Sequence, residues 1–308
     1  SKAFTAAAIL RLMDQGKVEL DSPVASYWPE FGRGGKETAT IRHVLLHQAG
    51  IPAPHLYRQI FMWPSWNSIT RTLARMPAQF PPGSRTAYHL VNFGFILGEV
   101  VRRVSGKPVD EFLATEFFEP MGLENIWMRI PSKDLRRSPR VFAAGEEMRK
   151  TAALFNLPII RRALIPAAGL HGSANDLAAF FQMLLSEGFY LDHQYLKPET
   201  IKMAAQSHYD GYDAYIKGNM SWGLGFIIGG SKYKSGDIML QSMGYGSSGS
   251  TFAAFGMGTC MVWADWEAGL VTAFTCDGML PDQEVGKRWA GISNAVWKWV
   301  SQNTDKKH

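Results

Sequence analysis

Three glycines near the C-terminal end, Gly244, Gly246 and Gly249, have the spacing Gly-x-Gly-x-x-Gly of a phosphate-binding loop. A dinucleotide-binding loop leaves a strand and enters a helix, whereas here the β-prone residues 251–255 follow. The histidines form no His-Glu-x-x-His pattern, the two cysteines form no Cys-x-x-Cys pair, and no Gly-x-Ser-x-Gly elbow occurs. We therefore expect no dinucleotide cofactor, no zinc hydrolase and no α/β-hydrolase.

The expected secondary structure changes from helices to strands along the chain. Helix-forming residues with apolar side chains at three-to-four spacing predominate first, and short β-rich runs separated by glycines follow after about residue 220. The expected helices are 3–15, 41–47, 66–75, 89–104, 109–118, 174–185 after a Ser173 cap, and 285–302. The expected strands are 222–228, 238–243, 251–255, 260–264 and 270–276, the last two joined by a hairpin loop over 265–269.

This order predicts an α+β chain, not a βαβ one. We expect a mainly helical region over residues 1–220 and an antiparallel sheet with a closing helix over 221–308, forming one unit. The basic segment 129–167 contains four prolines and predicts a long excursion over the surface, of the kind that often covers a binding site.

The composition of the 308 residues is that of a folded globular chain, with 46% hydrophobic and 19% charged residues. The net charge of +5 is spread along the sequence, so we expect no nucleic-acid partner. No apolar run approaches the roughly 18 residues that cross a bilayer, and no signal-peptide pattern is present. The cellular compartment stays undetermined.

The first 24 residues, from Ser1-Lys2-Ala-Phe-Thr to Asp21-Ser-Pro-Val24, resemble the active-site helix of serine β-lactamase-like proteins. That group includes class C β-lactamases, D-alanyl peptidases and related carboxylesterases, and its motif is Ser-x-x-Lys with a nucleophilic serine. The lysine is Lys2, and the serine would stand two positions before Ser1. Residues three apart on a helix share one face, with about 5–6 Å between their Cβ atoms. We therefore expect an upstream segment, which would also supply the first two strands of the sheet.

Tyr88, in the run Pro82-Gly-Ser-Arg-Thr-Ala-Tyr88, is similar to the tyrosine that faces the nucleophile in the family's second motif. A tyrosine with its ordinary pKa of about 10 is a poor base at neutral pH, but the ammonium of Lys2 would lower that pKa. The resemblance implies that Lys2 and Tyr88 activate the serine and that Tyr88 returns the proton to the leaving alcohol. β-Lactamases have Asn two residues after this tyrosine, where this chain has Leu90, and Asn92 could replace it only in part. Esters are therefore favoured over amides.

Tyr245, in the run Ser242-Met-Gly-Tyr245-Gly-Ser-Ser-Gly249, occupies the place of the lysine or histidine of the family's third motif. This exchange removes a positive charge that often binds a substrate carboxylate, which speaks against penicillin-like substrates. The resemblance implies that Tyr245, Gly246 and Ser248 bind substrate, with the backbone N–H of Ser248 completing an oxyanion hole.

Two further groups have a structural interpretation. The segment Thr40-Ile-Arg-His-Val-Leu-Leu-His47-Gln-Ala-Gly50 resembles a family segment ending in His-x-x-Gly, and we expect His47 to fasten a helix end and Gly50 to adopt a left-handed turn. A group of aromatic residues follows, which predicts core packing or one wall of an apolar acyl or alcohol pocket: Tyr57, Phe61, Trp63 and Trp66.

The resemblance implies a β-lactamase/penicillin-binding-protein-like α+β fold, in which a helical domain packs on an antiparallel sheet with a flanking C-terminal helix. The predicted function is that of a serine hydrolase cleaving small-molecule carboxylic esters through an acyl-enzyme, with no metal or organic cofactor. One alternative is a β-lactamase or D-amino peptidase acting on amides, and another is a non-catalytic β-lactamase-like binding protein. A third alternative makes Ser1 an N-terminal nucleophile that uses its own α-amino group.

Overall fold

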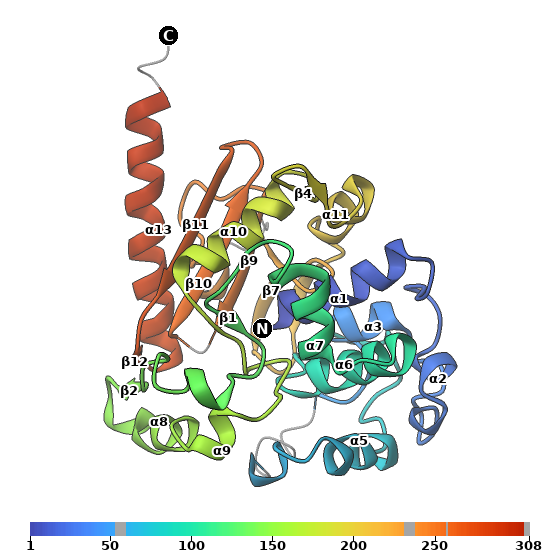
Figure 1. Cartoon of the computed structure of the whole chain (residues 1–308). Helices are drawn as coiled ribbons and strands as arrows, with labels where there is room; N and C mark the ends of the chain where they lie inside the picture. Colours follow the sequence, from blue (N-terminus) through green and yellow to red (C-terminus); the bar gives the residue numbers. More distant parts are fainter. Residues whose placement is uncertain (53–59, 231–237, 257, 305–308) are drawn as a thin grey trace.

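A helical layer and an antiparallel sheet lie against each other in the computed structural model, which describes residues 1–52, 60–230, 238–256 and 258–304 (Figure 1). The α-helices are α1 Lys2–Asp14, α2 Val24–Tyr27, α3 Ile41–Leu45, α5 Trp66–Arg75, α6 Asn92–Ser105, α7 Val109–Leu113, α8 Arg149–Phe155, α9 Pro158–Arg161, α10 Ala174–Leu185, α11 Pro198–Ala204, α12 Ile238–Gln241 and α13 Asp282–Thr304. The strands are β1 Ile126–Trp127, β2 Phe142–Ala143, β3 His171–Gly172, β4 Phe189–Tyr190, β5 His193–Gln194, β6 Tyr209–Asp213, β7 Gly218–Trp222, β8 Ile227–Ile228, β9 Thr251–Gly256, β10 Cys260–Asp265, β11 Leu270–Thr275 and β12 Gly278–Met279.

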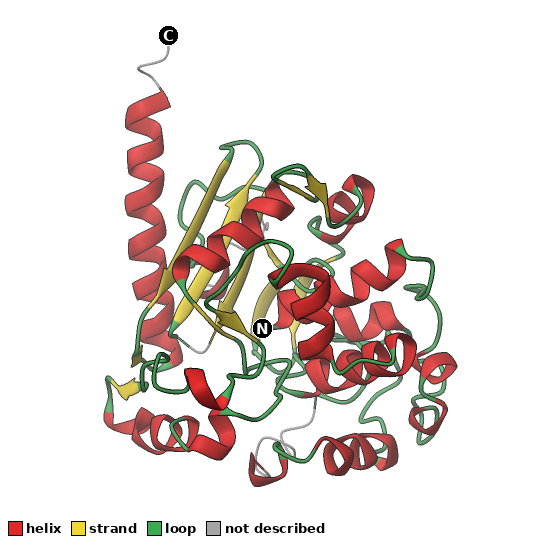
Figure 2. Ribbon diagram, viewed as in Figure 1, coloured by secondary structure: helices red, strands yellow, loops and turns green. Residues whose placement is uncertain are grey.

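The main sheet has six antiparallel strands in the order β11-β10-β9-β8-β7-β6, and helices cover both of its faces (Figure 2). On one face Phe252 of β9 stacks on Phe181 of α10, with ring centroids 5.7 Å apart. On the other face Trp263 of β10 stacks on Trp297 of α13 at 5.0 Å. Because successive side chains of a strand point to opposite faces, the apolar residues of β9 and β10 pack against helices on both faces of the sheet.

Most of the predicted elements are found close to their expected positions. The helix predicted over 66–75 is α5, and the hairpin predicted over 265–269 joins β10 to β11, where Asp265 pairs with Leu270. The N-cap Ser173 accepts a hydrogen bond from the backbone N–H of Asp176, as the capping pattern predicts. The α+β class is confirmed by the observed arrangement of helices and antiparallel sheet.

Three predictions need correction. The strand expected over 222–228 is not continuous, because β7 ends at Trp222 and β8 covers only Ile227–Ile228. The strand expected over 238–243 is wrong, because residues Ile238–Gln241 form the short helix α12. Periodicity alone does not separate a short apolar strand from a short buried helix. The sheet also begins before the predicted boundary at residue 221, since β6 and β7 occupy Tyr209–Asp213 and Gly218–Trp222.

Small residues bring α1 close to the sheet and the helical layer. Gly225, which has a φ of +92°, lies against Ala6 of α1 with no room for a Cβ atom. Gly94 of α6 is pressed in the same way against the backbone of Pro166 and Ala167. Because glycine alone tolerates these contacts, both positions hold α1, α6 and the 166–167 backbone at fixed separations. The amino-terminal end of α1 thus lies between the two layers (Figure 1).

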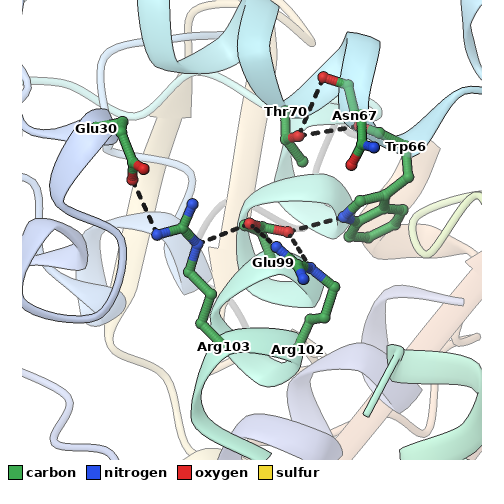
Figure 3. Close-up of polar contacts among 7 residues, drawn as sticks. All are labelled: Glu30, Trp66, Asn67, Thr70, Glu99, Arg102 and Arg103. Atoms are coloured by element: carbon green, nitrogen blue, oxygen red, sulfur yellow. Dashed lines mark hydrogen bonds and ion pairs between the residues drawn. The ribbon is translucent and has the colours of Figure 1, made fainter. Parts of the chain in front are cut away.

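A buried carboxylate anchors α6, the helix that follows Tyr88. Glu99 is 1% exposed and accepts hydrogen bonds from Arg102, Arg103 and the indole of Trp66, and Arg103 also pairs with Glu30 (Figure 3). Burial alone would raise the pKa of Glu99, but these hydrogen bonds outweigh it and hold the pKa below its ordinary value. The cluster therefore joins α6 to α5 and to the turn that contains Glu30.

In the described part of the chain, no helix combines the length and the apolar character needed to traverse a bilayer.

Candidate active site

A cavity of about 720 Å³ opens at the amino-terminal end of α1, between the helical layer and the sheet. Ser1, Lys2, Tyr88 and Leu90 are among the residues that line it. Apolar side chains such as Phe155 and polar ones from the segment 125–173 form other walls. A cavity of this size, mostly apolar with a few convergent polar groups, suits a small organic substrate.

Lys2 points toward the aromatic ring of Tyr88. Its Nζ atom lies 4.6 Å from the centroid of that ring and donates a hydrogen bond of 3.3 Å to the carbonyl of Ala167. Burial lowers the pKa of Lys2 from 10.5 to about 7. A large part of the Lys2 population is therefore neutral near pH 7, which lets an amine act as a proton acceptor.

Contacts to both its backbone and its ring hold Tyr88. Its N–H donates a hydrogen bond of 3.0 Å to Oδ1 of Asp213, a fully buried carboxylate at the end of β6. Its ring stacks on Trp222 of β7 with an interplanar angle of 9°, and the imidazole of His47 lies 4.7 Å away. Tyr88 lines the cavity, and the structure brings it next to Lys2.

His47 has a supporting position behind Tyr88. It is 1% exposed and has a φ of 60°, and its Nδ1 accepts a hydrogen bond of 3.1 Å from the N–H of His89. Burial, together with the nearby His89 and Lys2, lowers the pKa of His47 well below its ordinary value. Gly50 has a φ of 81°, the left-handed turn that was expected there. Both residues thus have the structural positions predicted for them.

Leu90, two residues after Tyr88, contributes an apolar side chain to the cavity wall. Asn92 instead is fully buried, and its side-chain nitrogen donates a hydrogen bond of 2.7 Å to the carbonyl of Ile51. Asn92 therefore does not bring an amide group to the cavity wall in place of the missing asparagine.

The structure does not bring Tyr245 and Gly246 to Lys2. Tyr245 is 63% exposed, and its backbone N–H donates a hydrogen bond of 2.8 Å to Asn294 of α13. Gly246 lies against the indole of Trp297, also in α13, where a Cβ atom would collide with the ring. Neither residue lines the cavity, because the loop before β9 packs on the C-terminal helix instead.

The predicted oxyanion donor is engaged elsewhere. The N–H of Ser248 donates a hydrogen bond of 2.9 Å to Oγ1 of Thr251, whose hydroxyl in turn donates to the buried carboxylate of Asp265. Ser248 is also absent from the cavity wall. This position does not support the predicted role of Ser248, since a donor with a partner is not available to a substrate.

The ends of three strands, all further along the chain than Ser248, line the cavity instead. Phe255 and Gly256 end β9, Cys260 begins β10, and Thr275 ends β11, with Cys276 immediately after it. Thr251–Phe255 was predicted as a strand, but its far end was not assigned to the site. These residues match no catalytic motif in the sequence. They lie together only because β9, β10 and β11 pair side by side.

The aromatic group separates into different environments. Trp63 is 1% exposed and forms part of the cavity wall, whereas Phe61 is 74% exposed. Trp66 packs on Phe95 of α6 and donates its indole N–H to Glu99. Tyr57 lies outside the described residues.

Lys2 and Tyr88 thus supply an amine with a pKa of about 7 and a phenol to the wall of a largely apolar cavity. Such a pair can move a proton between a hydroxyl and a leaving group.

Comparisons with known proteins identify relatives of this chain. The chain is 33% identical over 134 residues to the esterase/beta-lactamase LipL of Mycobacterium tuberculosis (strain ATCC 25618 / H37Rv), covering 44% of this chain and 31% of LipL. It is 25% identical over 197 residues to the D-alanyl-D-alanine-carboxypeptidase/endopeptidase AmpH of Escherichia coli (strain K12), covering 62% of this chain and 48% of AmpH. These matches span less than half the length of either relative.

The fold agrees with that of a solved enzyme. The crystal structure of a family VIII carboxylesterase matches with a TM-score of 0.80 and 25% identity, covering 95% of this chain and 81% of the carboxylesterase. The profile of the family described as Beta-lactamase matches residues 1–296. The chain therefore has the β-lactamase/penicillin-binding-protein-like fold and belongs to the Beta-lactamase family.

Proposed function

We propose that the protein containing this chain is a serine hydrolase that cleaves small carboxylic esters through an acyl-enzyme. The contact of Lys2 with Tyr88 carries this proposal, because it places a lysine of pKa about 7 beside a phenol in the cavity wall. The similarity to LipL and to a family VIII carboxylesterase supports ester chemistry.

In the proposed reaction, the nucleophile is a serine three residues before Lys2, one turn earlier on the same helix face. Its hydroxyl oxygen attacks the ester carbonyl carbon while its proton passes to the Lys2–Tyr88 pair. The pair then returns that proton to the departing alcohol, and the acyl group remains on the serine. Water releases the acid in a second round of the same proton transfers, so neither a metal nor an organic cofactor takes part in the proposal.

The walls of the cavity favour esters over amides. Leu90 stands at the position where β-lactamases have an amide-binding asparagine, and Asn92 is turned into the core toward Ile51. The similarity to AmpH keeps amide or peptide hydrolysis as a second candidate function.

A comparison of two chromogenic substrates tests the proposal. The natural gene product should hydrolyse p-nitrophenyl butyrate, should lose that activity after treatment with a serine-directed phosphonate, and should turn over nitrocefin far more slowly. Faster turnover of nitrocefin would favour the amide alternative. Failure to hydrolyse any short-chain ester would favour a non-catalytic binding protein.

A further inference from the structure

A second pair of chemically competent side chains lies in the wall of the same cavity. Oγ of Ser138 is 3.0 Å from Nδ1 of His171, and both residues line the cavity. Ser138 belongs to the basic, proline-interrupted segment 129–167, and His171 lies in β3, where it pairs with Trp127 of β1. A hydroxyl at this distance from an imidazole is the geometry of a nucleophile beside its base.

The protonation state of His171 suits a base. Burial, together with the charge of Arg161, lowers the pKa of His171 from 6.5 to about 4. A neutral imidazole has one nitrogen that donates and one that accepts a hydrogen bond, and the proposal takes Nδ1 as the acceptor for the hydroxyl of Ser138, with the ring hydrogen on Nε2. The ring is thus neutral at pH 7 and able to accept a proton.

A guanidinium group lies beside the same serine. Nη2 of Arg161 donates hydrogen bonds to the carbonyls of Ser138 at 2.6 Å and Leu135 at 3.1 Å. Arg161 lines the cavity, and within the described ranges no carboxylate forms an ion pair with it. Burial and the charge of Arg140 lower the pKa of Arg161. A cation with no acidic partner, adjacent to a hydroxyl, can stabilise negative charge that develops on a substrate oxygen.

We propose that Ser138 and His171 form a second nucleophile–base pair, which is acylated by activated carboxylic esters, with Arg161 stabilising the oxyanion. Oγ of Ser138 bonds to the ester carbonyl carbon while its proton moves to Nδ1 of His171. The bond between that carbon and the alcohol oxygen then breaks, and His171 returns the proton to the departing alcohol. The product is an ester of Ser138, and water activated by His171 hydrolyses it to the free acid.

This pair is separate from Lys2 and Tyr88 although it shares their cavity. The segment after Ala167 connects the two pairs: the carbonyl of Ala167 accepts from Lys2, the N–H of Leu170 donates to Oγ of Ser1, and His171 follows. The reactivity of Ser138 requires neither Lys2 nor Tyr88. A test can therefore give opposite results for the two proposals.

Covalent labelling of the natural gene product, with the serine three residues before Lys2 replaced by alanine, tests the proposal. The chain is treated at pH 7.5 with a fluorophosphonate, which bonds to a serine oxygen with loss of fluoride, and the labelled peptide is identified by mass spectrometry. We expect one phosphonate on Ser138. The S138A variant should not be labelled, H171Q should be labelled about 100-fold more slowly, and S132A, an exposed serine of the same segment, should behave like the unchanged chain.

Several outcomes would overturn the proposal. Label on Ser1, label spread over exposed serines, or no label on the folded chain would each contradict a reactive Ser138. Circular dichroism and thermal unfolding identify a variant that fails to fold, and in that case the near-isosteric S138C replaces S138A and must resist the fluorophosphonate. In the natural gene product, K2M and Y88F should leave the labelling of Ser138 unchanged while ester turnover falls. This last comparison separates failure of this pair from failure of the proposed function.

Discussion

Nζ of Lys2 lies over the ring of Tyr88, 4.6 Å from its centroid, although the two residues belong to different elements. The amino-terminal end of α1 carries Lys2, and the segment that leads into α6 carries Tyr88. Asp213 and Trp222, on two strands of the sheet, hold the backbone and the ring of Tyr88. Helical layer and sheet must therefore assemble before the pair exists. Three predictions concern this pair, and two more concern the Glu99 cluster that anchors α6.

Replacing Lys2 by methionine should lower kcat/KM for p-nitrophenyl butyrate by about 10²–10⁴-fold in the natural gene product, because loss of a positioned proton acceptor costs that much. Methionine is unbranched, is only one atom shorter than lysine and has no ionisable group. Lys17, an exposed lysine, provides the control, and its replacement by methionine should leave turnover unchanged. Equal turnover in the two variants would remove Lys2 from the mechanism.

The pKa of Lys2, lowered to about 7 by burial, predicts the pH dependence of ester turnover. The neutral amine is the active form, so its fraction rises with pH. Below pH 7, kcat/KM should increase about tenfold per pH unit, and it should level off above that value. The full profile of the unchanged enzyme from pH 5 to 9 measures this, and a flat profile between pH 5.5 and 7.5 would contradict the assignment of Lys2 as the base.

Tyr88 lines the cavity and Tyr245 does not, so phenylalanine variants of the two should behave differently. The Tyr88→Phe change removes the phenol that faces Lys2 and should reduce turnover by at least about 100-fold. The Tyr245→Phe change alters an exposed ring outside the cavity wall and should have little effect. Steady-state kinetics on both variants decides the matter, and a large loss in Tyr245→Phe would restore the role predicted from the sequence.

Replacing Glu99 by glutamine should destabilise the protein by about 1–3 kcal/mol, since it removes the buried carboxylate that accepts charge-assisted hydrogen bonds from the partly exposed Arg102 and Arg103. Urea denaturation measures the change, and the exposed Glu119→Gln variant is the control, with an expected effect near zero.

The same cluster predicts a pH effect on stability. Because the pKa of Glu99 is depressed in the folded protein, its stabilisation is complete above the ordinary carboxyl pKa. It is lost as the pH falls through the lower, folded value. The stability difference between the natural protein and Glu99→Gln should therefore shrink in acid, and a difference that stays constant down to pH 3 would disagree.

Local sequence patterns predict some elements of this fold and fail at others. Local patterns were sufficient for α5, for the Ser173 cap and for the hairpin at Asp265–Gly269, because neighbouring residues alone decide such features. They failed at Ile238–Gln241, where a few apolar residues suit a strand and a helix equally well.

Residue types and their spacing are enough to find the family motifs around Lys2 and Tyr88, and apolar periodicity is enough to find most of the helices near them. Which side chains meet depends on how the elements pack. Tyr245, Gly246 and Ser248 are turned toward α13 and Thr251, and Ser138 is brought to His171 from a distant segment. The reason is physical, because strand pairing and layer packing set such distances through contacts between residues that are far apart in the chain, and local sequence does not encode those contacts.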